Sequence, residues 1–486
     1  METFVIKAIQ LIFSLAILVI VHELGHFLFA KLFKIRVEKF YLFFNPTISL
    51  VKCKKINGKW CFKFFSKNLS NTETETSEDG MPVLDEKGKG KQKMIDTSLL
   101  PADDWRKYPE NTEYGIGWLP LGGYVKIAGM VDESMDMAAL KRPPQPWEFR
   151  TRPAWQRLFV MVGGALMNFI FAFFIYSIVV ANWGDNYIPM DKTPLYFSET
   201  VQEAGFQDGD ILLTANGKAL SRYDNLDLFR VIDAETVTIL RSEQEITLNL
   251  PEDFKSRFLA SKMPFADFSQ AIVDSVLPES NAEKAGLQAG DRIISINQTQ
   301  TTAFAIFSMQ LSKYKDSKVE LRVIRGQDTL QLVSRVDEQG KLGFFPSRPQ
   351  VYVSKHYNFF QSIPAGIGTG IRTMSFYVLQ LKLLFSKAGI SNIGGFGAIG
   401  NLFPAQWDWL TFWMQTALIS IMLGVMNLLP VPVLDGGHVL FTLYEMITRR
   451  KPSDKFLENA QWTGLILLIA LMVYANGMDV IRAFFR

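Results

Sequence analysis

Residues 4–32 read FVIKAIQLIFSLAILVIVHELGHFLFAKL, a stretch long and apolar enough to cross a bilayer as one helix. A membrane-spanning helix needs about 20 consecutive, mostly apolar residues. The stretch has no small-residue cleavage site and stays apolar past His26, so we interpret it as a retained helix and not as a signal peptide.

Inside this predicted helix lies the motif His22-Glu23-Leu24-Gly25-His26. Histidines four residues apart project from one face of a helix, so both imidazoles can reach one metal ion, and Glu23 is placed to take a proton from an attacking water. Zinc suits imidazole ligands, and ionisable residues within lipid mark functional sites by default. A packed histidine pair is the alternative, but only four histidines occur in the chain, which makes a chance match rare. We therefore predict one Zn²⁺ per chain and hydrolysis inside the bilayer.

Two histidines leave a zinc ion short of a third protein ligand. Residues 427–438 read NLLPVPVLDGGH, and Asp435 is the only carboxylate between Asp408 and Glu445. Taken alone, Asp435 would be a helix cap or a turn residue before two glycines. With an incomplete metal site elsewhere in the membrane, ligation is the better interpretation, and His438 remains a rival ligand.

The composition also indicates a membrane protein. The chain is 48% hydrophobic and 20% charged, whereas soluble domains carry about 25% charged residues. Further apolar stretches of spanning length occupy residues 158–183, 411–429 and 463–481. The 51 Lys and Arg nearly balance the 48 Asp and Glu, which argues against a nucleic-acid partner. Cys53 and Cys61 form neither a disulfide framework nor a CxxC metal motif.

The distribution of Lys and Arg predicts the orientation of the spans, because cytoplasmic loops carry an excess of both. Basic residues follow the first span, precede the second, and lie between the third and the fourth. Residues 34–157 and 435–462 are therefore expected in the cytoplasm, and residues 184–410 and both termini outside.

A repeat organises the outer region. The sequence AGFQDGD at residues 204–210 recurs as AGLQAGD at residues 285–291, which predicts two tandem modules. Beyond them, an amphipathic helix is predicted near residues 359–385, resting on the outer membrane surface.

The segment expected on the cytoplasmic side combines a polar insert with strand-like runs. Residues 66–113 combine a Thr/Glu run with a Lys/Gly run, which predicts a flexible insert that buries no core. Strand-like runs flank it at residues 60–65 and 114–127 and predict a hairpin or small sheet.

Taken together, these motifs resemble the site-2 protease family of intramembrane zinc proteases. HExxH in the first span and NxxPxPxLDGGH in the third match the two signatures of that family. The resemblance extends to the order of the spans, the run GGYVK at residues 122–126, an asparagine at position 168 in the second span, and the paired modules. It implies His22, His26 and Asp435 as zinc ligands and Glu23 as the general base.

The resemblance also implies residues that hold the substrate. A membrane-spanning substrate must be unwound before attack, and unwound backbone in lipid needs new hydrogen-bond partners. A strand edge supplies them by β-addition, and an asparagine side chain offers amide donors and an acceptor. The implied substrate-binding residues are Gly122, Gly123 and Tyr124 in a membrane-associated β-hairpin, and Asn427, Pro430 and Pro432 at the end of the third span. A turn-rich cytoplasmic loop is the alternative for the hairpin, and simple helix termination is the alternative for the prolines.

The repeated modules resemble PDZ domains of the bacterial, permuted kind, which carry a carboxylate-binding loop near their last strand. In the second module, Leu342-Gly343-Phe344 fits such a loop. The comparable residues of the first module, Met263-Pro264-Phe265, include a proline that removes an amide donor, so that groove is expected to be degenerate. The alternative is that both modules act only as a steric filter over the active site.

The predicted fold class is a polytopic α-helical membrane protein with four membrane-spanning helices, a membrane-associated β-hairpin or sheet, and two tandem α+β PDZ-like domains. The predicted segments are a first span with HExxH (1–33), a β region (34–130), a linker (131–157), a second span (158–183), two PDZ-like domains (186–267 and 268–348), a membrane-surface region (349–410), a third span (411–434), a cytoplasmic loop (435–462) and a fourth span (463–485).

The predicted activity is hydrolysis of peptide bonds within the membrane-spanning segments of single-span proteins in the bacterial inner membrane. The resemblance implies anti-sigma factors already trimmed by another protease, and remnant signal peptides, as substrates. A transporter or proton relay and a catalytically inactive PDZ scaffold are the alternatives. The HExxH motif argues against the first, and the intact set of catalytic residue types argues against the second.

Overall fold

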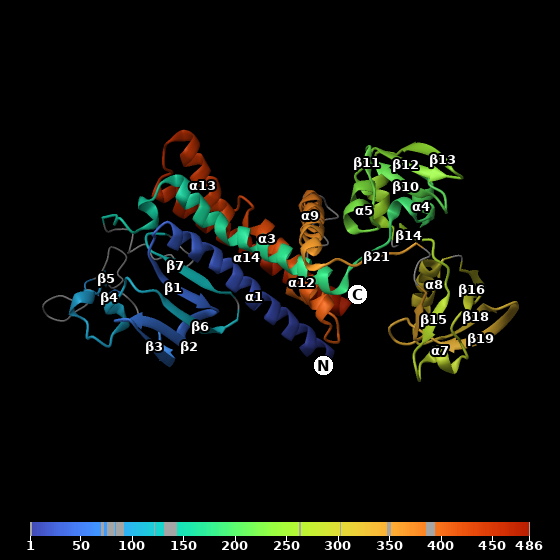
Figure 1. Cartoon of the computed structure of the whole chain (residues 1–486), viewed down its shortest axis with the longest axis horizontal. Helices are drawn as coiled ribbons and strands as arrows, with labels where there is room; N and C mark the ends of the chain where they lie inside the picture. The colour runs from blue at the N-terminus through green and yellow to red at the C-terminus, as the bar shows by residue number, and fades with distance from the viewer. Residues whose placement is uncertain are drawn as a thin grey trace. The chain divides into compact units, whose positions relative to one another are not determined.

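A computed structural model describes residues 2–69, 72–74, 83, 92–120, 122–130, 143–261, 264–301, 303–347, 351–384 and 394–485. The chain divides into two units, Met1–Asn182 with Phe359–Arg486 and Trp183–Asn358 (Figure 1). Each unit is described by itself.

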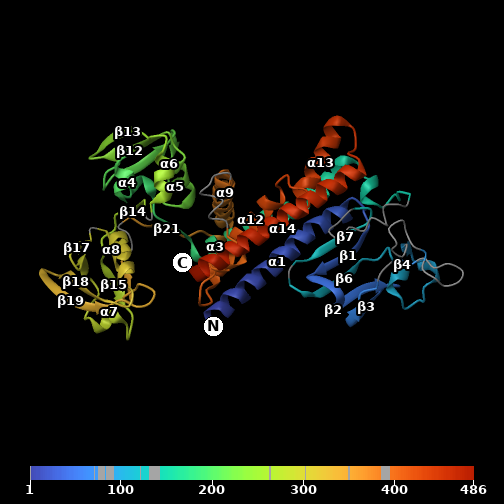
Figure 2. The ribbon, with the colours of Figure 1, turned by 180° about the vertical axis from the view of Figure 1, so that it is seen from behind.

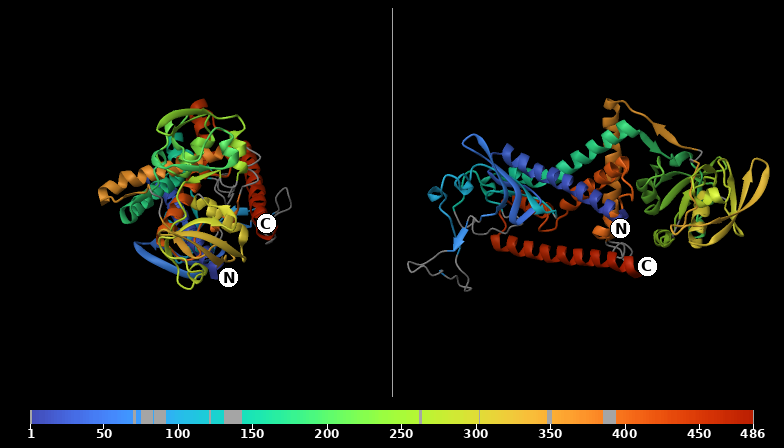
Figure 3. Two further views of the ribbon diagram at one scale, coloured as in Figure 1. Left: turned by 90° about the vertical axis from the view of Figure 1, so that its right-hand side faces the viewer. Right: turned by 90° about the horizontal axis from the view of Figure 1, so that it is seen from below.

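Four helices of the first unit are long and apolar enough to cross a membrane: α1 (Glu2–Leu32), α3 (Ala154–Trp183), α12 (Trp409–Asn427) and α14 (Asp454–Phe485). They contain three of the four predicted apolar stretches and all but the last two residues of the third one, 411–429. Helix α14 is one long, uninterrupted helix (Figure 3). Helices α1 and α3 approach closely, because a Cβ on Gly25 would lie 2.1 Å from the carbonyl oxygen of Gly163. Small residues allow such close contact between membrane helices.

Two further helices lie near the spans. Helix α9 (Phe359–Leu384) covers the predicted amphipathic segment and packs against α3, where a Cβ on Gly366 would lie 2.3 Å from the backbone nitrogen of Ser177. Its place on the membrane surface stays a prediction. Helix α13 (Asp435–Thr448) begins the segment 435–462, whose place in the cytoplasm stays a prediction. Apolar residues at helical spacing after Asp435 explain the helix. A short helix, α11 (Phe396–Gly400), precedes α12.

A five-stranded sheet lies beside α1 (Figures 1 and 2). Its strand order is β3 (Lys59–Lys67), β2 (Phe44–Ile56), β6 (Glu113–Leu119), β1 (Val37–Leu42) and β7 (Tyr124–Ile127). Only β1 and β6 run parallel, and β7 forms one edge. The β2–β3 turn is Asn57-Gly58, with φ angles of 49° and 80° that a tight hairpin turn requires.

Part of the predicted flexible insert lies outside the described residues. The described part contains β4 (Thr72–Thr74), β5 (Gln92–Met94), η1 (Thr97–Leu99) and η2 (Trp105–Lys107). Asp104 caps η2 by accepting a hydrogen bond from the Arg106 amide at 2.9 Å, and Trp105 is buried. The prediction that the insert buries no core is therefore wrong around Trp105, since one aromatic side chain can bury a large area.

The second unit contains two modules with the same strand order. The first has β11-β10-β12-β13 (Lys218–Ala219, Ile211–Ala215, Thr236–Arg241, Gln244–Asn249) and the second β17-β16-β18-β19 (Thr299–Gln300, Arg292–Ile296, Lys318–Arg325, Asp328–Arg335). A two-stranded sheet accompanies each, β14 (Phe265–Asp267) with β9 (Leu195–Phe197) and β15 (Val273–Val276) with β20 (Phe344–Pro346). The helices α4 (Glu199–Gln202), α5 (Asn225–Ile232) and α6 (Phe254–Ala260) belong to the first module, and α7 (Asn281–Lys284) and α8 (Phe304–Leu311) to the second.

The repeated aspartates have equivalent partners. Asp210 and Arg241 form an ion pair at 2.7 Å in the first module, and Asp291 and Arg325 form one at 2.7 Å in the second. The repeat seen in the sequence is thus also a repeat of structure, while its assignment to PDZ domains stays a prediction.

Candidate metal centre

Side chains from α1 and α13 meet at one point. His22 Nε2 and His26 Nε2 lie 3.2 Å apart, and Asp435 Oδ2 lies 3.2 Å from the first and 3.3 Å from the second. Tetrahedral ligands held about 2.0–2.1 Å from a zinc ion would lie roughly 3.3–3.4 Å from one another. Asp435 Oδ2 is buried and accepts no well-oriented hydrogen bond from a described residue, so a bound cation would satisfy it. The donor atoms and their spacing therefore fit zinc.

A tight turn after α12 brings Asp435 to the histidines. The turn includes Val433 with a φ of 94°, a strained conformation for a β-branched residue. A Cβ on Gly436 would lie 2.1 Å from the carbonyl oxygen of Leu429, so the turn folds back onto its own backbone. His438, the rival ligand, is not part of the cluster, and its Nε2 lies 3.5 Å from Gln461 Nε2 of α14.

Helix α3 supplies partners for both histidines. His26 Nδ1 lies 2.8 Å from the carbonyl oxygen of Val160, so this nitrogen donates its proton and Nε2 keeps a free lone pair. His22 Nδ1 lies 3.2 Å from Asn168 Nδ2, while Asn168 Oδ1 is buried without a partner among the described residues. If the Asn168 amide is turned around, Oδ1 accepts a proton from His22 Nδ1, and His22 Nε2 is also left free.

Gly164 lies between these two contacts. A Cβ there would lie 2.5 Å from His26 Nε2 and 2.6 Å from His22 Cε1, so only glycine leaves room for the imidazoles. Local sequence patterns give no indication that Val160, Gly164 and Asn168 act on the histidines. A buried asparagine in an apolar span is the one available signal, because polar residues in lipid are costly.

Glu23 and Asn427 complete the surroundings of the cluster. The backbone amide of Val125 on β7 donates a hydrogen bond to the Glu23 carboxylate, which interacts electrostatically with all three candidate ligands. Asn427, the last residue of α12, places its Nδ2 3.4 Å from His22 Nε2. Pro430 and Pro432 lie in the turn that follows, after the helix has ended.

Of the glycine pair before β7, Gly123 lies against α1 and Gly122 lies against Phe44 of β2. A Cβ on Gly123 would lie 2.8 Å from Val19 Cγ1 and 2.6 Å from the carbonyl oxygen of Tyr41. Gly122 has a φ of 149°. Tyr124 stacks on Tyr41 with ring centroids 5.3 Å apart. These contacts hold the start of the edge strand β7 against α1, next to Val125, whose amide reaches Glu23.

The residues proposed as a carboxylate-binding loop belong to the second unit. Leu342 is buried, and Phe344 packs against Phe307 with ring centroids 6.0 Å apart. Gly343 has a φ of 92°, and a Cβ there would lie 2.4 Å from Ser280 Cβ. The backbone alone therefore requires glycine at this position, and carboxylate binding stays a prediction. In the first module, residue 263 lies outside the described residues, and Phe265 is buried in the module core.

The family model described as Peptidase family M50 matches residues 10–66 and 101–471. The chain is 26% identical to the putative zinc metalloprotease of Vibrio cholerae, with 98% of both chains covered. It is 27% identical to the regulator of sigma E protease of Haemophilus influenzae, covering 97% of this chain and 98% of the relative. It is 26% identical to the regulator of sigma-E protease RseP of Escherichia coli K12, covering 99% and 100%. The chain therefore belongs to peptidase family M50 and is a zinc metalloprotease.

Proposed function

We propose that this chain binds one zinc ion through His22, His26 and Asp435 and uses it to cleave peptide bonds inside the bilayer. The observation that carries the proposal is the triangle of His22 Nε2, His26 Nε2 and Asp435 Oδ2, set on an apolar helix of spanning length. When bound, zinc polarises the scissile carbonyl and lowers the pKa of water, which makes attack possible at neutral pH.

Residues of the protein transfer the proton, orient the ligands and bind the substrate carbonyl. Glu23 accepts a proton from the attacking water and returns it to the leaving nitrogen, as a general base and then a general acid. The Val125 amide orients the Glu23 carboxylate. Val160 and Asn168 hold the two imidazoles so that each presents Nε2 to the metal. Asn427, at 3.4 Å from His22 Nε2, is close enough to donate a hydrogen bond to a substrate carbonyl at the same centre.

The edge of β7 is the proposed binding place for an unwound substrate. β7 is one of the two edge strands of the sheet, and Gly123 packs it against Val19 of α1. A substrate segment added to this edge would find main-chain partners for its exposed amides and carbonyls. Gly122, Gly123 and Tyr124 are thus assigned to substrate binding, together with Asn427 and with Pro430 and Pro432 in the turn.

The substrates we propose are single-span proteins of the bacterial inner membrane, namely anti-sigma factors already trimmed by another protease and remnant signal peptides. The names of two relatives, which refer to regulation of sigma E, support this class. Residues 184–410 and both termini would face outward, with residues 34–157 and 435–462 in the cytoplasm. The two modules would act as PDZ-like filters that exclude large outer domains.

The catalytic assignment is tested with Glu23→Gln in the full chain. Glutamine keeps the side-chain shape but cannot accept the proton, so cleavage of a tagged single-span substrate in proteoliposomes should fall by at least ~10²-fold while zinc stays bound. Glu458→Gln, on the exposed surface of α14, is the matched control and should retain activity. Substantial cleavage by Glu23→Gln would overturn the assignment.

The filter is tested by deleting residues 190–345. The shortened protein should cut substrates that still carry their outer domains, which the full chain spares. If discrimination survives the deletion, the modules do not filter by size, and Leu342-Gly343-Phe344 becomes the better candidate for capture of a chain terminus.

A further inference from the structure

The five-stranded sheet has one apolar and one charged face. Trp60, Phe62 and Phe64 alternate along β3 and are 53%, 58% and 65% exposed. Lys63 points to the other face, because successive side chains of a strand point to opposite faces. On β2, Lys52 lies directly across from Lys63 and so shares its face. An exposed aromatic face suits contact with lipid. Lipid contact does not explain why lysines gather on the opposite face.

A cavity of about 450 Å³ lies on this lysine face, next to the segment that carries Trp105. Lys39, Lys52, Lys54 and Lys63 are among the residues that line it. Lys52 and Lys54 are buried, with exposed fractions of 7% and 5%. Burial lowers the pKa of both ammonium groups.

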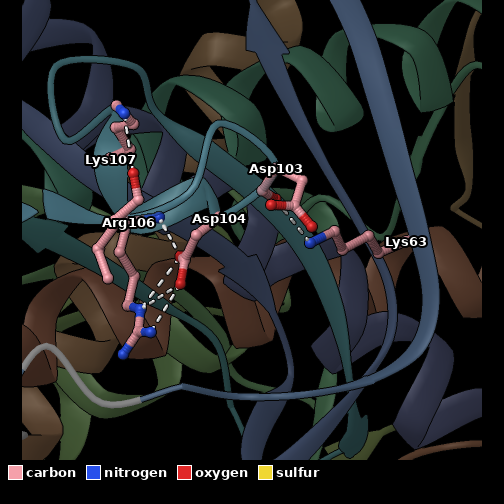
Figure 4. Close-up of polar contacts among 6 residues, drawn as sticks. Lys63, Asp103, Asp104, Arg106 and Lys107 are labelled. Carbon is pink, nitrogen blue, oxygen red and sulfur yellow. Dashed lines mark hydrogen bonds and ion pairs between the residues drawn. The ribbon is translucent and has the colours of Figure 1, made fainter.

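The acidic residues of the cavity are already engaged. Asp104 binds Arg106 at 2.7 Å (Figure 4), Glu38 lies 3.8 Å from Arg36, Glu148 lies 2.5 Å from Arg150, and Glu113 accepts the hydroxyl of Tyr41 at 2.6 Å. Three of these four carboxylates thus face an arginine, while Glu113, whose hydrogen bond comes from a neutral hydroxyl, attracts Lys52 and Lys54 electrostatically.

The lysines instead meet main-chain oxygens. Lys52 donates to the carbonyl of Lys67 at 3.1 Å, Lys54 to that of Trp105 at 3.0 Å, and Lys63 to that of Asp103 at 3.4 Å (Figure 4). Within the described part of the chain, none of these three ammonium groups, nor that of Lys39, forms an ion pair. The described lining residues carry six Lys or Arg side chains and four carboxylates, so positive charges outnumber negative charges by two around this cavity.

The register of the sheet adds repulsion between two of these lysines. Lys52 and Lys63 face each other on neighbouring antiparallel strands, a position where like charges destabilise a sheet. Both ammonium groups also lie near the same Trp105 ring, at 5.8 Å and 4.8 Å from its centroid. Lys52 and Lys54 are buried and form no ion pair with a described residue, and buried charges are normally paired, so an anion that joins them best explains the arrangement.

We infer that this cavity binds a phosphate-bearing anion between Lys39, Lys52, Lys54 and Lys63. Lysine ammonium groups bind phosphate as compact point charges. The cavity volume lies within the range of small-molecule sites, roughly 300–1,000 Å³. The phosphate can come from the headgroup of an anionic phospholipid, given the apolar face of the same sheet, or from a free phosphate compound. The site is separate from the metal centre and does not depend on its activity.

The two sources are distinguished with the full chain in nanodiscs. In one arm, phosphatidylcholine discs receive inorganic pyrophosphate at constant ionic strength, and in the other, phosphatidylglycerol replaces part of the phosphatidylcholine. One of the arms should raise the melting temperature of the protein. Pyrophosphate binding is confirmed by line broadening in ³¹P NMR. Stabilisation in neither arm overturns the inference.

Lys63→Gln identifies the site, and Lys55→Gln is the matched control. Lys55 lies on β2 with its side chain exposed, so its removal changes net charge equally without touching the cavity. Lys63→Gln should weaken the phosphate effect by about tenfold or more, as expected for a charged hydrogen bond. Without ligand it should raise the melting temperature, since it removes the like charge opposite Lys52, whereas a merely structural lysine would lower it. Equal weakening in both variants, or a lower melting temperature for unliganded Lys63→Gln, would contradict the assignment.

Discussion

Replacing Gly164 with alanine should weaken zinc binding without unfolding the chain. The new Cβ would lie 2.5 Å from His26 Nε2, a contact that real structures do not tolerate, so the imidazole must retreat. The retreat has to be roughly half an ångström or more, while zinc ligands tolerate about 0.2 Å. Overpacking of this kind costs about 1–3 kcal/mol, which corresponds to an affinity loss of about 5- to 150-fold.

Zinc affinity is measured by competition with a chelator of known strength, and unfolding is followed by circular dichroism. Gly477→Ala is the control, because it lies on α14 and a Cβ there has no atom within 4 Å. Alanine also favours a helix by about 1 kcal/mol over glycine, so both variants should keep their helical content. If Gly164→Ala binds zinc as tightly as Gly477→Ala, then the imidazoles do not occupy the positions described, and the reasoning fails.

Asn168→Leu should lower zinc affinity by about 10- to 100-fold, whereas Asn168→Asp should retain it, because a carboxylate still accepts the imidazole proton; chelator competition measures both. Asp435→Ala should remove zinc from the purified protein and His438→Ala should not, so equal metal loss in the two would contradict the ligand set. Burial alone would raise the pKa of Asp291, but hydrogen bonds from Arg325 and a backbone amide outweigh it and hold the pKa below its usual value. This stabilisation is present at neutral pH and is lost as pH falls below about 4, so Asp291→Asn should lower the melting temperature more at neutral than at acidic pH; equal losses would refute it.

The sequence predicted those features that a local pattern encodes. Long apolar runs indicated the spanning helices, and the four-residue spacing of His22 and His26 placed both imidazoles on one helix face. Asp435 could be identified from the sequence because it is the single carboxylate between Asp408 and Glu445. The helix that begins at Asp435 was missed, because the PxPxLDGG turn obscures the apolar periodicity that follows it.

The parts that could not be predicted depend on contacts between distant segments. The Val160 carbonyl, the missing side chain of Gly164 and the Asn168 amide act on the histidines from another helix. Every residue has a backbone carbonyl, and a glycine can be required for several different structural reasons. Neither feature therefore indicates in the sequence which residue it contacts. The buried position of Trp105 likewise depends on a sheet whose strands come from separate stretches.

The contact between Gly25 and Gly163 restricts how any molecule can reach the metal centre. Two backbones in van der Waals contact leave no gap that side-chain motion could widen, so α1 and α3 form a closed wall behind the histidines. We expect the substrate to approach from the side of β7, whose Val125 amide reaches Glu23. An inhibitor with a zinc-binding group should therefore carry an extended, strand-like body, because such a body can add to the edge of β7.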